Sequence, residues 1–449
     1  MRRERLWLIC ILAAFSVSVL FAIARGAPFE VDESVYATQA RAWAAGGPTT
    51  GILPHRAPLL PAMGTLIYKA GARSEWPFRL TGLFFGLASL VLVWALGRAI
   101  AGPRPGLLAA AVFAAAPTVE LRSSQFMTDV PATAFLLAAT FILWKNRDRV
   151  DRSLLCFAPA AAAAVYARYA SALPVGLLVI AALIGCREGL AARPRIALAT
   201  VGLTSLLLVP HVVRAIQVTG KPWGLVTFTA GYAGRRYVGQ GLRDYVYWFP
   251  FALAGPLAGV VMSVGLIGAV VRRSAAALFL VAVGLLDIVV IGLVDHGEAR
   301  FIFFPIALLC IAGSAWAARA KPAWLAVAAC AAALATSGVY VAHRTNRART
   351  LRAPPALAGH TIAALAHHHP CVVLSVDVGP TTWYSGCSTY YFNDPAYRRA
   401  DFMLIYRQGG VLLRVQPATL PLPHGPPIAV TDAHGREAAT VFVVGRPVE

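Results

Sequence analysis

Charged residues are scarce in this chain. Lys, Arg, Asp and Glu together make up 13% of its 449 residues, whereas 58% are hydrophobic. A soluble domain normally needs more charge than this on a surface that faces water. The composition therefore excludes an ordinary soluble protein and indicates that lipid is the main solvent.

The alternation of polar and apolar residues that is typical of a transmembrane barrel is also missing. The apolar residues fall instead into runs of roughly 18 to 22 residues, the length that a helix needs to cross a bilayer. This pattern predicts an all-α polytopic membrane protein with about eleven spans, over residues 6–24, 78–97, 105–118, 129–145, 154–167, 170–186, 195–216, 247–271, 275–294, 301–318 and 323–342.

Acidic residues number 20 against 40 basic ones, which gives a formal charge of +20. The basic residues are spread singly among apolar runs and form no basic domain, which argues against a nucleic-acid partner. They recur in alternate short loops, as in MRRER at the start and KNRDRVDR from Lys145. By the positive-inside rule these loops are cytoplasmic. We therefore predict an inner-membrane protein with a cytoplasmic N-terminus and an extracytoplasmic tail.

The tail differs in character from the rest of the chain. Short strand-like runs, CVVLSVDV, STYYF, DFMLIY and TVFVV, alternate there with turn residues. We predict a membrane domain over 1–343 and a small α/β domain over 344–449, interpreted as a stabilising cap. CxxC motifs are absent, and Cys371 and Cys387 are the only cysteine pair in the polar tail. In an oxidising compartment they are expected to form a disulfide.

A polar loop over 25–76 follows the first span and is too long for an idle connection. It contains Asp32 and Glu33, followed by an amphipathic stretch that predicts a short helix on the membrane surface. Carboxylates at a helix start are stabilised by the exposed amides. The two acids are therefore either a capping pair or groups that take part in catalysis. Asp129 opens the span over 129–145, where the alternative is again a helix cap. If both acidic clusters converge, one carboxylate could serve as a general base.

Cations also occur on the predicted outer side. His55 and Arg56 precede an apolar stretch, and Arg300 begins the span over 301–318. A guanidinium suits phosphate because its planar fork donates two parallel hydrogen bonds, although an arginine here could simply reach lipid headgroups. Candidate acceptor or lipid contacts complete the set: Tyr36, Arg168, Arg235, Arg236 and Tyr237.

Neither a P-loop nor a GxGxxG motif leading into a basic helix is present, so a nucleotide-bound donor is not expected. No metal ligands are predicted, because the adjacent histidines over 367–369 cannot all face one ion. A divalent metal is compatible with the proposed chemistry but is not required by it.

Several elements, in order, carry a family resemblance: the DE pair with Tyr36 and Ala37, HRAPLLP, the run from FRLTGLFF to GLLAA, TDVP with Asp129, and ARFIFFP. With these the chain resembles the lipid-linked-sugar transferases of the GT-C superfamily, in the branch of protein mannosyltransferases and aminoarabinose transferases (families 39 and 83). It departs from the pattern at Ala57, where the first proline is common, which leaves the phosphate ligand open between His55 and Arg56.

The resemblance implies a GT-C fold and an integral membrane glycosyltransferase. Such an enzyme would move a sugar from a polyprenyl-phosphate donor to a lipid, glycan or protein acceptor on the extracytoplasmic face, with inversion. Asp32 would be the general base, Glu33 its support and Asp129 the second acid. Arg300, together with His55 or Arg56, would bind the donor phosphate.

Two other classes of function compete with this interpretation. A transporter or flippase of a lipid-linked sugar would carry ionisable groups inside its spans, and Asp287 is the only clear acid of that kind. A non-catalytic scaffold would tolerate the loss of the predicted base. The absence of a visible internal repeat favours the enzyme.

Overall fold

The computed structural model describes residues 2–48, 56–227, 239–248, 251–272, 274–294, 297–318, 323–366, 371–375, 377–390, 403–408, 428–431 and 437–444. The chain divides into two compact units. Unit 1 comprises Met1–Ala22, Pro54–Leu59 and Arg79–Ala342, and unit 2 comprises Ile23–Leu53, Leu60–Phe78 and His343–Glu449. Unit 2 therefore combines most of the first loop with the tail. The predicted division of the chain into domains 1–343 and 344–449 stays a prediction.

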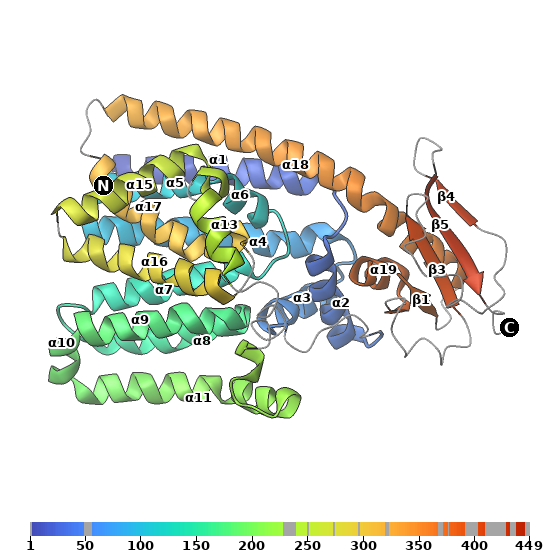
Figure 1. Ribbon diagram of the computed structural model, residues 1–449, viewed down its shortest axis with the longest axis horizontal. Helices are drawn as coiled ribbons and strands as arrows, with labels where there is room; N and C mark the ends of the chain where they lie inside the picture. The colour runs from blue at the N-terminus through green and yellow to red at the C-terminus, as the bar shows by residue number, and fades with distance from the viewer. Residues whose placement is uncertain are drawn as a thin grey trace. The chain divides into compact units, whose positions relative to one another are not determined.

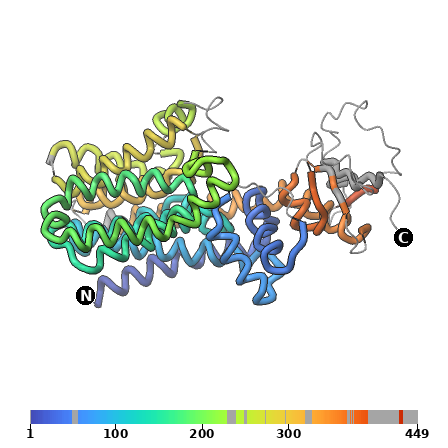
Figure 2. Tube along the Cα trace, turned by 90° about the horizontal axis from the view of Figure 1, so that it is seen from below, coloured from blue at the N-terminus to red at the C-terminus, as the bar shows by residue number. Residues whose placement is uncertain are grey.

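Unit 1 is helical, and its long helices run side by side (Figures 1 and 2). Its helices are α1 (Arg2–Ala24), α4 (Glu75–Ala101), α5 (Pro103–Ala114), α6 (Pro117–Ser123), α7 (Asp129–Lys145), α8 (Phe157–Ala167), α9 (Ala172–Gly185), α10 (Arg187–Ala192), α11 (Pro194–Thr219), α13 (Gln240–Trp248), α14 (Phe251–Ala254), α15 (Pro256–Arg272), α16 (Ala275–Val294), α17 (Phe303–Ala317) and the first half of α18 (Ala323–Ala366). Short 3₁₀ turns η1 (Arg152–Cys156), η2 (Tyr169–Ser171) and η3 (Ala299–Ile302) lie between them.

Apolar length explains which helices suit a membrane. Among the described residues, 5 helices are long and apolar enough to cross one, or up to 6 if the bent pair α5 and α6 counts as one span. Shorter apolar helices cover 152–167, 169–185 and 256–271. Several apolar helices were predicted and are present, whereas the number of about eleven spans stays a prediction.

Small residues bring the helices of unit 1 together. On α17, a Cβ added at Gly313 would lie 1.8 Å from the backbone oxygen of Val261 on α15. A Cβ at Gly265 would lie 2.6 Å from the backbone nitrogen of Gly313. Lipid gives helices no hydrophobic reason to associate, so close backbone packing at small residues does this instead.

Unit 2 contains a five-stranded sheet of order β2-β1-β3-β5-β4. The strands are β1 (Val372–Leu374), β2 (Ser388–Tyr390), β3 (Met403–Gln408), β4 (Ile428–Thr431) and β5 (Glu437–Val444). β1 pairs in parallel with β2 and β3, and β5 pairs antiparallel with β3 and β4. Helix α19 (Val378–Ser385) makes the crossover from β1 to β2 that a parallel pair requires. Each predicted strand-like run contains a strand, while β4 was not predicted.

Helix α18 continues without interruption through Pro354 and Pro355, where the sequence suggested the start of the tail domain. A proline removes a helical hydrogen bond, so packing has to compensate for it. Ala358 and Ile362 of this helix are fully buried against Val373 and the cysteines of the sheet. This apolar contact stabilises the helix beyond the prolines.

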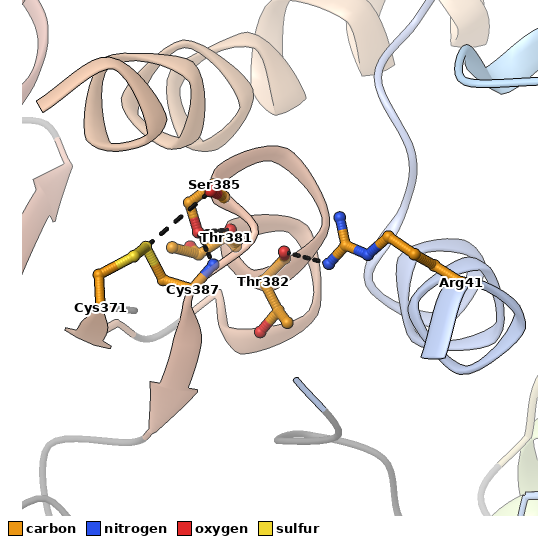
Figure 3. Close-up of a disulfide and its surroundings, with 6 residues drawn as sticks. All are labelled: Arg41, Cys371, Thr381, Thr382, Ser385 and Cys387. Carbon is orange, nitrogen blue, oxygen red and sulfur yellow. Dashed lines mark hydrogen bonds between the residues drawn. A yellow bond between two sulfur atoms is a disulfide. The ribbon is translucent and has the colours of Figure 1, made fainter. Parts of the chain in front are cut away.

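The predicted disulfide between Cys371 and Cys387 is confirmed, and it brackets α19 (Figure 3). Helix α19 packs on α2 (Val31–Ala45), and α3 (Leu59–Lys69) also belongs to unit 2. Arg41 of α2 donates hydrogen bonds of 2.8 Å to the backbone oxygens of Thr382 and Trp383. Burial lowers the pKa of the Arg41 guanidinium. Its two hydrogen bonds to the carbonyls of α19 connect α2 to α19.

Candidate functional site

A buried ion pair lies at the start of α7 in unit 1. Asp129 is the first residue of this helix, and its side chain is 3% exposed. Its Oδ1 lies 2.9 Å from Nη1 of Arg168, so the two side chains form an ion pair. Arg168 stands at the break between α8 and η2, where the extended backbone turns its side chain out of the helical path. The carboxylate of Asp129 is thus engaged with a guanidinium as well as standing at a helix start.

A second arginine comes from η3. Nη2 of Arg300 donates to Oε1 of Glu298 at 3.3 Å, and the Arg300 side chain is 14% exposed. The ring of Phe301 lies close to both cations, with its centroid 4.2 Å from the guanidinium carbon of Arg168 and 5.2 Å from that of Arg300. An aromatic ring shared in this way holds two like charges near each other.

These groups line one cavity within unit 1. Its polar lining consists of Asp129, Thr133, Arg168, Ser171, Asp287 and Arg300. The structure therefore brings together two predicted site residues, Asp129 and Arg300, with Arg168, which the sequence indicated only as an acceptor or lipid contact. Arg56 also belongs to unit 1, is half-buried and is not part of this lining.

Asp287 was not among the predicted site residues. It lies on α16, is 1% exposed, and faces the cavity. The signal that could have identified it was present in the sequence, because an acid inside an apolar span needs a partner or a task. What the sequence lacks is any indication of the direction in which this side chain points.

The predicted acids of the first loop belong to unit 2. Glu30 and Glu33 form a capping box at the start of α2, in which Oε2 of Glu33 accepts from the Glu30 amide at 2.9 Å. Glu33 is fully buried and lies 3.5 Å from Nη1 of Arg352, whose Nη2 is 2.8 Å from Oε2 of Glu30. The capping alternative therefore applies to Glu33. Asp32 is half-buried and stands outside the capping box.

Other predicted contacts fall in different places. Tyr36 of α2 is buried at 4% exposure. His55, Arg235, Arg236 and Tyr237 lie outside the described residues. Among the residues that the structure does describe, no group of three or more His, Cys, Asp and Glu side chains could hold a metal ion.

Comparison with known proteins shows what this chain is similar to. Residues 55–213 match the model of the family described as dolichyl-phosphate-mannose-protein mannosyltransferase. The fold resembles that of ArnT from Cupriavidus metallidurans bound to undecaprenyl phosphate, with a TM-score of 0.69 and 16% identity over 97% of this chain and 98% of that one. The chain thus resembles this mannosyltransferase family over residues 55–213 and has the fold of ArnT over almost its whole length. The resemblance found in the sequence is thereby confirmed.

Further solved structures are similar over less of their length or at lower identity. The apo state of the same ArnT matches with a TM-score of 0.70 and 14% identity, covering 97% of both chains. The oligosaccharyltransferase AglB from Archaeoglobus fulgidus, in complex with an inhibitory peptide and a dolichol-phosphate, matches with a TM-score of 0.56 and 12% identity over 88% of this chain. The present chain covers 65% of that AglB chain. No curated protein sequence matches it.

Proposed function

We propose that this protein is an integral membrane glycosyltransferase of the GT-C superfamily that uses a polyprenyl-phosphate-linked sugar as donor. The observation that carries the proposal is the cavity that Arg168 and Arg300 line between apolar helices. Charged groups at such a position are costly unless they have a task. ArnT, whose fold this chain shares, has been crystallised with undecaprenyl phosphate. A phosphate on a polyprenyl chain is the anion that fits both the charge and the surroundings.

The two arginines would bind the donor phosphate. A guanidinium carries five N–H donors in a planar fork whose shape matches phosphate oxygens, and both arginines line the cavity. The paired acids would hold both guanidiniums in place before the lipid arrives. During transfer, the same donors would stabilise the negative charge that develops on the departing phosphate, an effect that is strong where water is excluded.

The reaction proposed is a displacement at the anomeric carbon. An acceptor hydroxyl or amine forms the new bond on the face opposite the phosphate, while the bond from the anomeric carbon to the phosphate oxygen breaks and its electron pair leaves with the polyprenyl phosphate. The configuration is inverted. Asp32 is proposed to take the acceptor proton as general base, because Glu33 is occupied by the capping box. The acceptor is a lipid, glycan or protein on the extracytoplasmic face.

The test is transfer by the purified full chain in liposomes, with radiolabelled polyprenyl-phosphate sugars. Asp32→Asn should remain folded and lose roughly 100- to 10,000-fold in rate, the usual contribution of a general base. Asp148→Asn, at a loop carboxylate that is 80% exposed, is the matched control and should keep its activity. Full transfer by Asp32→Asn would remove Asp32 from its role. Mass spectrometry of lipids and glycans from cells with and without the gene would identify the sugar and the acceptor.

A transporter of lipid-linked sugar is the second candidate, and the buried Asp287 within α16 favours it. The same liposomes separate the two functions. A transporter would move the labelled lipid across the bilayer without consuming it, whereas a transferase would release polyprenyl phosphate.

A further inference from the structure

The feature that the proposed reaction leaves unused is the side chain of Asp287. It is 1% exposed and stands inside α16, seven residues before the helix ends at Val294, or about 10 Å along the axis. Its Oδ1 is buried and has no hydrogen-bond partner among the described residues. A buried polar atom without a partner costs free energy, and more so in a helix surrounded by lipid. Because this cost is offset when a bound ligand donates a hydrogen bond to Oδ1, the unpaired oxygen indicates a ligand-binding position.

The charges around the cavity limit what that ligand can be. Arg168 and Arg300 already have carboxylate partners in Asp129 and Glu298, so Asp287 is not needed to hold either of them. A phosphate bound to the arginines would repel a third carboxylate if it lay directly against it. The part of the ligand that meets Asp287 must therefore be something other than the phosphate.

The chemistry of the donor leaves one answer. A carboxylate only accepts hydrogen bonds. The polyprenyl chain has no hydrogen-bond donors, and neither has an ionised phosphodiester. The hydroxyl or amino groups of the sugar are the only donors on the molecule, and the sugar is joined directly to the phosphate through its anomeric oxygen. A sugar ring in the cavity would thus lie next to the arginines.

We infer that Asp287 is a specificity-determining residue that accepts a hydrogen bond from a hydroxyl or amino group of the donor sugar. The inference rests on the proposed function, since it assigns to Asp287 one part of the donor proposed there. By this inference the cavity has two subsites: Arg168 and Arg300 bind the phosphate, and Asp287 binds the sugar. A site built to bind a substrate hydroxyl rejects an analogue that lacks it, so this contact would select the sugar.

The experiment compares lipids with and without the sugar. Binding of a short-chain polyprenyl phosphate, and of the same lipid carrying mannose, glucose or arabinose, is measured by native mass spectrometry on the full chain in detergent. Wild-type protein should bind at least one glycosylated lipid more tightly than the bare one. Asp287→Leu, which fills the space with an apolar side chain, should lose roughly 10- to 100-fold of affinity for that lipid and keep its affinity for bare polyprenyl phosphate.

Two further variants make the result decisive. Asp287→Asn preserves the shape and a polar atom, so it answers the same question if the leucine variant does not fold, and a loss of roughly threefold to tenfold is expected for the glycosylated lipid alone. Glu120→Gln is the matched control, because Glu120 is an equally buried acid of unit 1 that lies outside the cavity lining. It should bind both lipids as the wild type does.

Each outcome has a defined meaning. Equal weakening of both lipids by Asp287→Leu would show that Asp287 only balances the charge of the arginines, and unchanged binding of both would also overturn the inference. If wild-type protein bound no glycosylated lipid more tightly than bare polyprenyl phosphate, the inference about Asp287 would be overturned, while binding of the polyprenyl phosphate itself would still stand. If the wild type bound neither lipid, the proposed function itself would fail. If the inference holds, lipid-linked sugars that lack single hydroxyls would identify the group that contacts Asp287. Loss of that hydroxyl should weaken binding to wild type but not to Asp287→Leu.

Discussion

Nη1 of Arg168 lies 2.9 Å from Oδ1 of Asp129, and this ion pair links the break after α8 to the first residue of α7. Both side chains are largely buried among apolar helices. A buried pair of this kind adds little stability when compared with apolar residues, but removing one partner leaves the other charge uncompensated. The pair is therefore best explained by the cavity that it lines.

Breaking this pair should be costly for folding. Arg168→Leu leaves Asp129 charged without its partner and should lower the free energy of unfolding by about 3–5 kcal/mol. The double variant Arg168→Leu with Asp129→Leu should regain most of that stability but no transfer activity. Thermal unfolding in detergent and transfer in liposomes measure the two effects. A double variant no more stable than the single one would contradict the energetic account.

Arg352 should hold the start of α2 in place. Arg352→Ala removes the cation next to Glu33, which is fully buried, while the capping box remains. The loss should destabilise this helix start by about 1–3 kcal/mol, the cost of leaving a buried polar group without a partner. Faster hydrogen exchange at the first amides of α2 would show it. Arg349→Ala, at an exposed arginine of the same helix, should leave those exchange rates unchanged.

Gly379 should be intolerant of a side chain. A Cβ at this position of α19 would lie 2.6 Å from Oγ of Ser34 and 3.0 Å from the backbone oxygen of Val31. Gly379→Ala should therefore push α19 from α2 and cost about 1–3 kcal/mol. Thermal unfolding measures the loss, and adding Ser34→Gly should recover part of it. Gly202→Ala, in a helix with open space around it, should cost nothing.

The disulfide should stabilise unit 2. Cys371 and Cys387 are 16 residues apart, and closing a loop of that length is worth about 3 kcal/mol in the unfolded chain. Replacing both cysteines by serine should lower the melting temperature of the full chain and expose α19 to hydrogen exchange. A reductant should have the same effect on the wild type and no effect on the double serine variant. Equal sensitivity of the two proteins would count against this role.

Asp377 should make the stability of unit 2 depend on pH. Burial raises the pKa of this carboxyl, which precedes α19. The unfolded chain therefore loses its proton first as the pH rises. The contribution of Asp377 to the free energy of unfolding is therefore fully present below the ordinary pKa of an aspartate. It is lost as the pH rises through the raised pKa of the folded state. Asp377→Asn should remove this dependence, so its melting temperature should exceed that of wild type at neutral pH and match it at low pH.

Much of the fold follows from local sequence. Runs of apolar residues are sufficient to predict membrane helices, because their length has to match the thickness of the hydrocarbon. The strand-like runs of the tail and the pairing of Cys371 with Cys387 were predicted in the same way, from composition within a few residues. Asp129 at the start of a helix was likewise evident, since a turn and a proline mark the boundary.

The partners of these groups were decided by tertiary structure. A helix that is apolar on every side carries no stripe to show which face packs inward, so its sequence does not reveal where an acid such as Asp287 points. Arg168 meets Asp129, and Arg352 meets Glu33, through packing between segments far apart in the chain. The sequence by itself determined the membrane class, the helices and the acids and cations available for chemistry. The way in which the helices turn and pack determined which of them share a cavity.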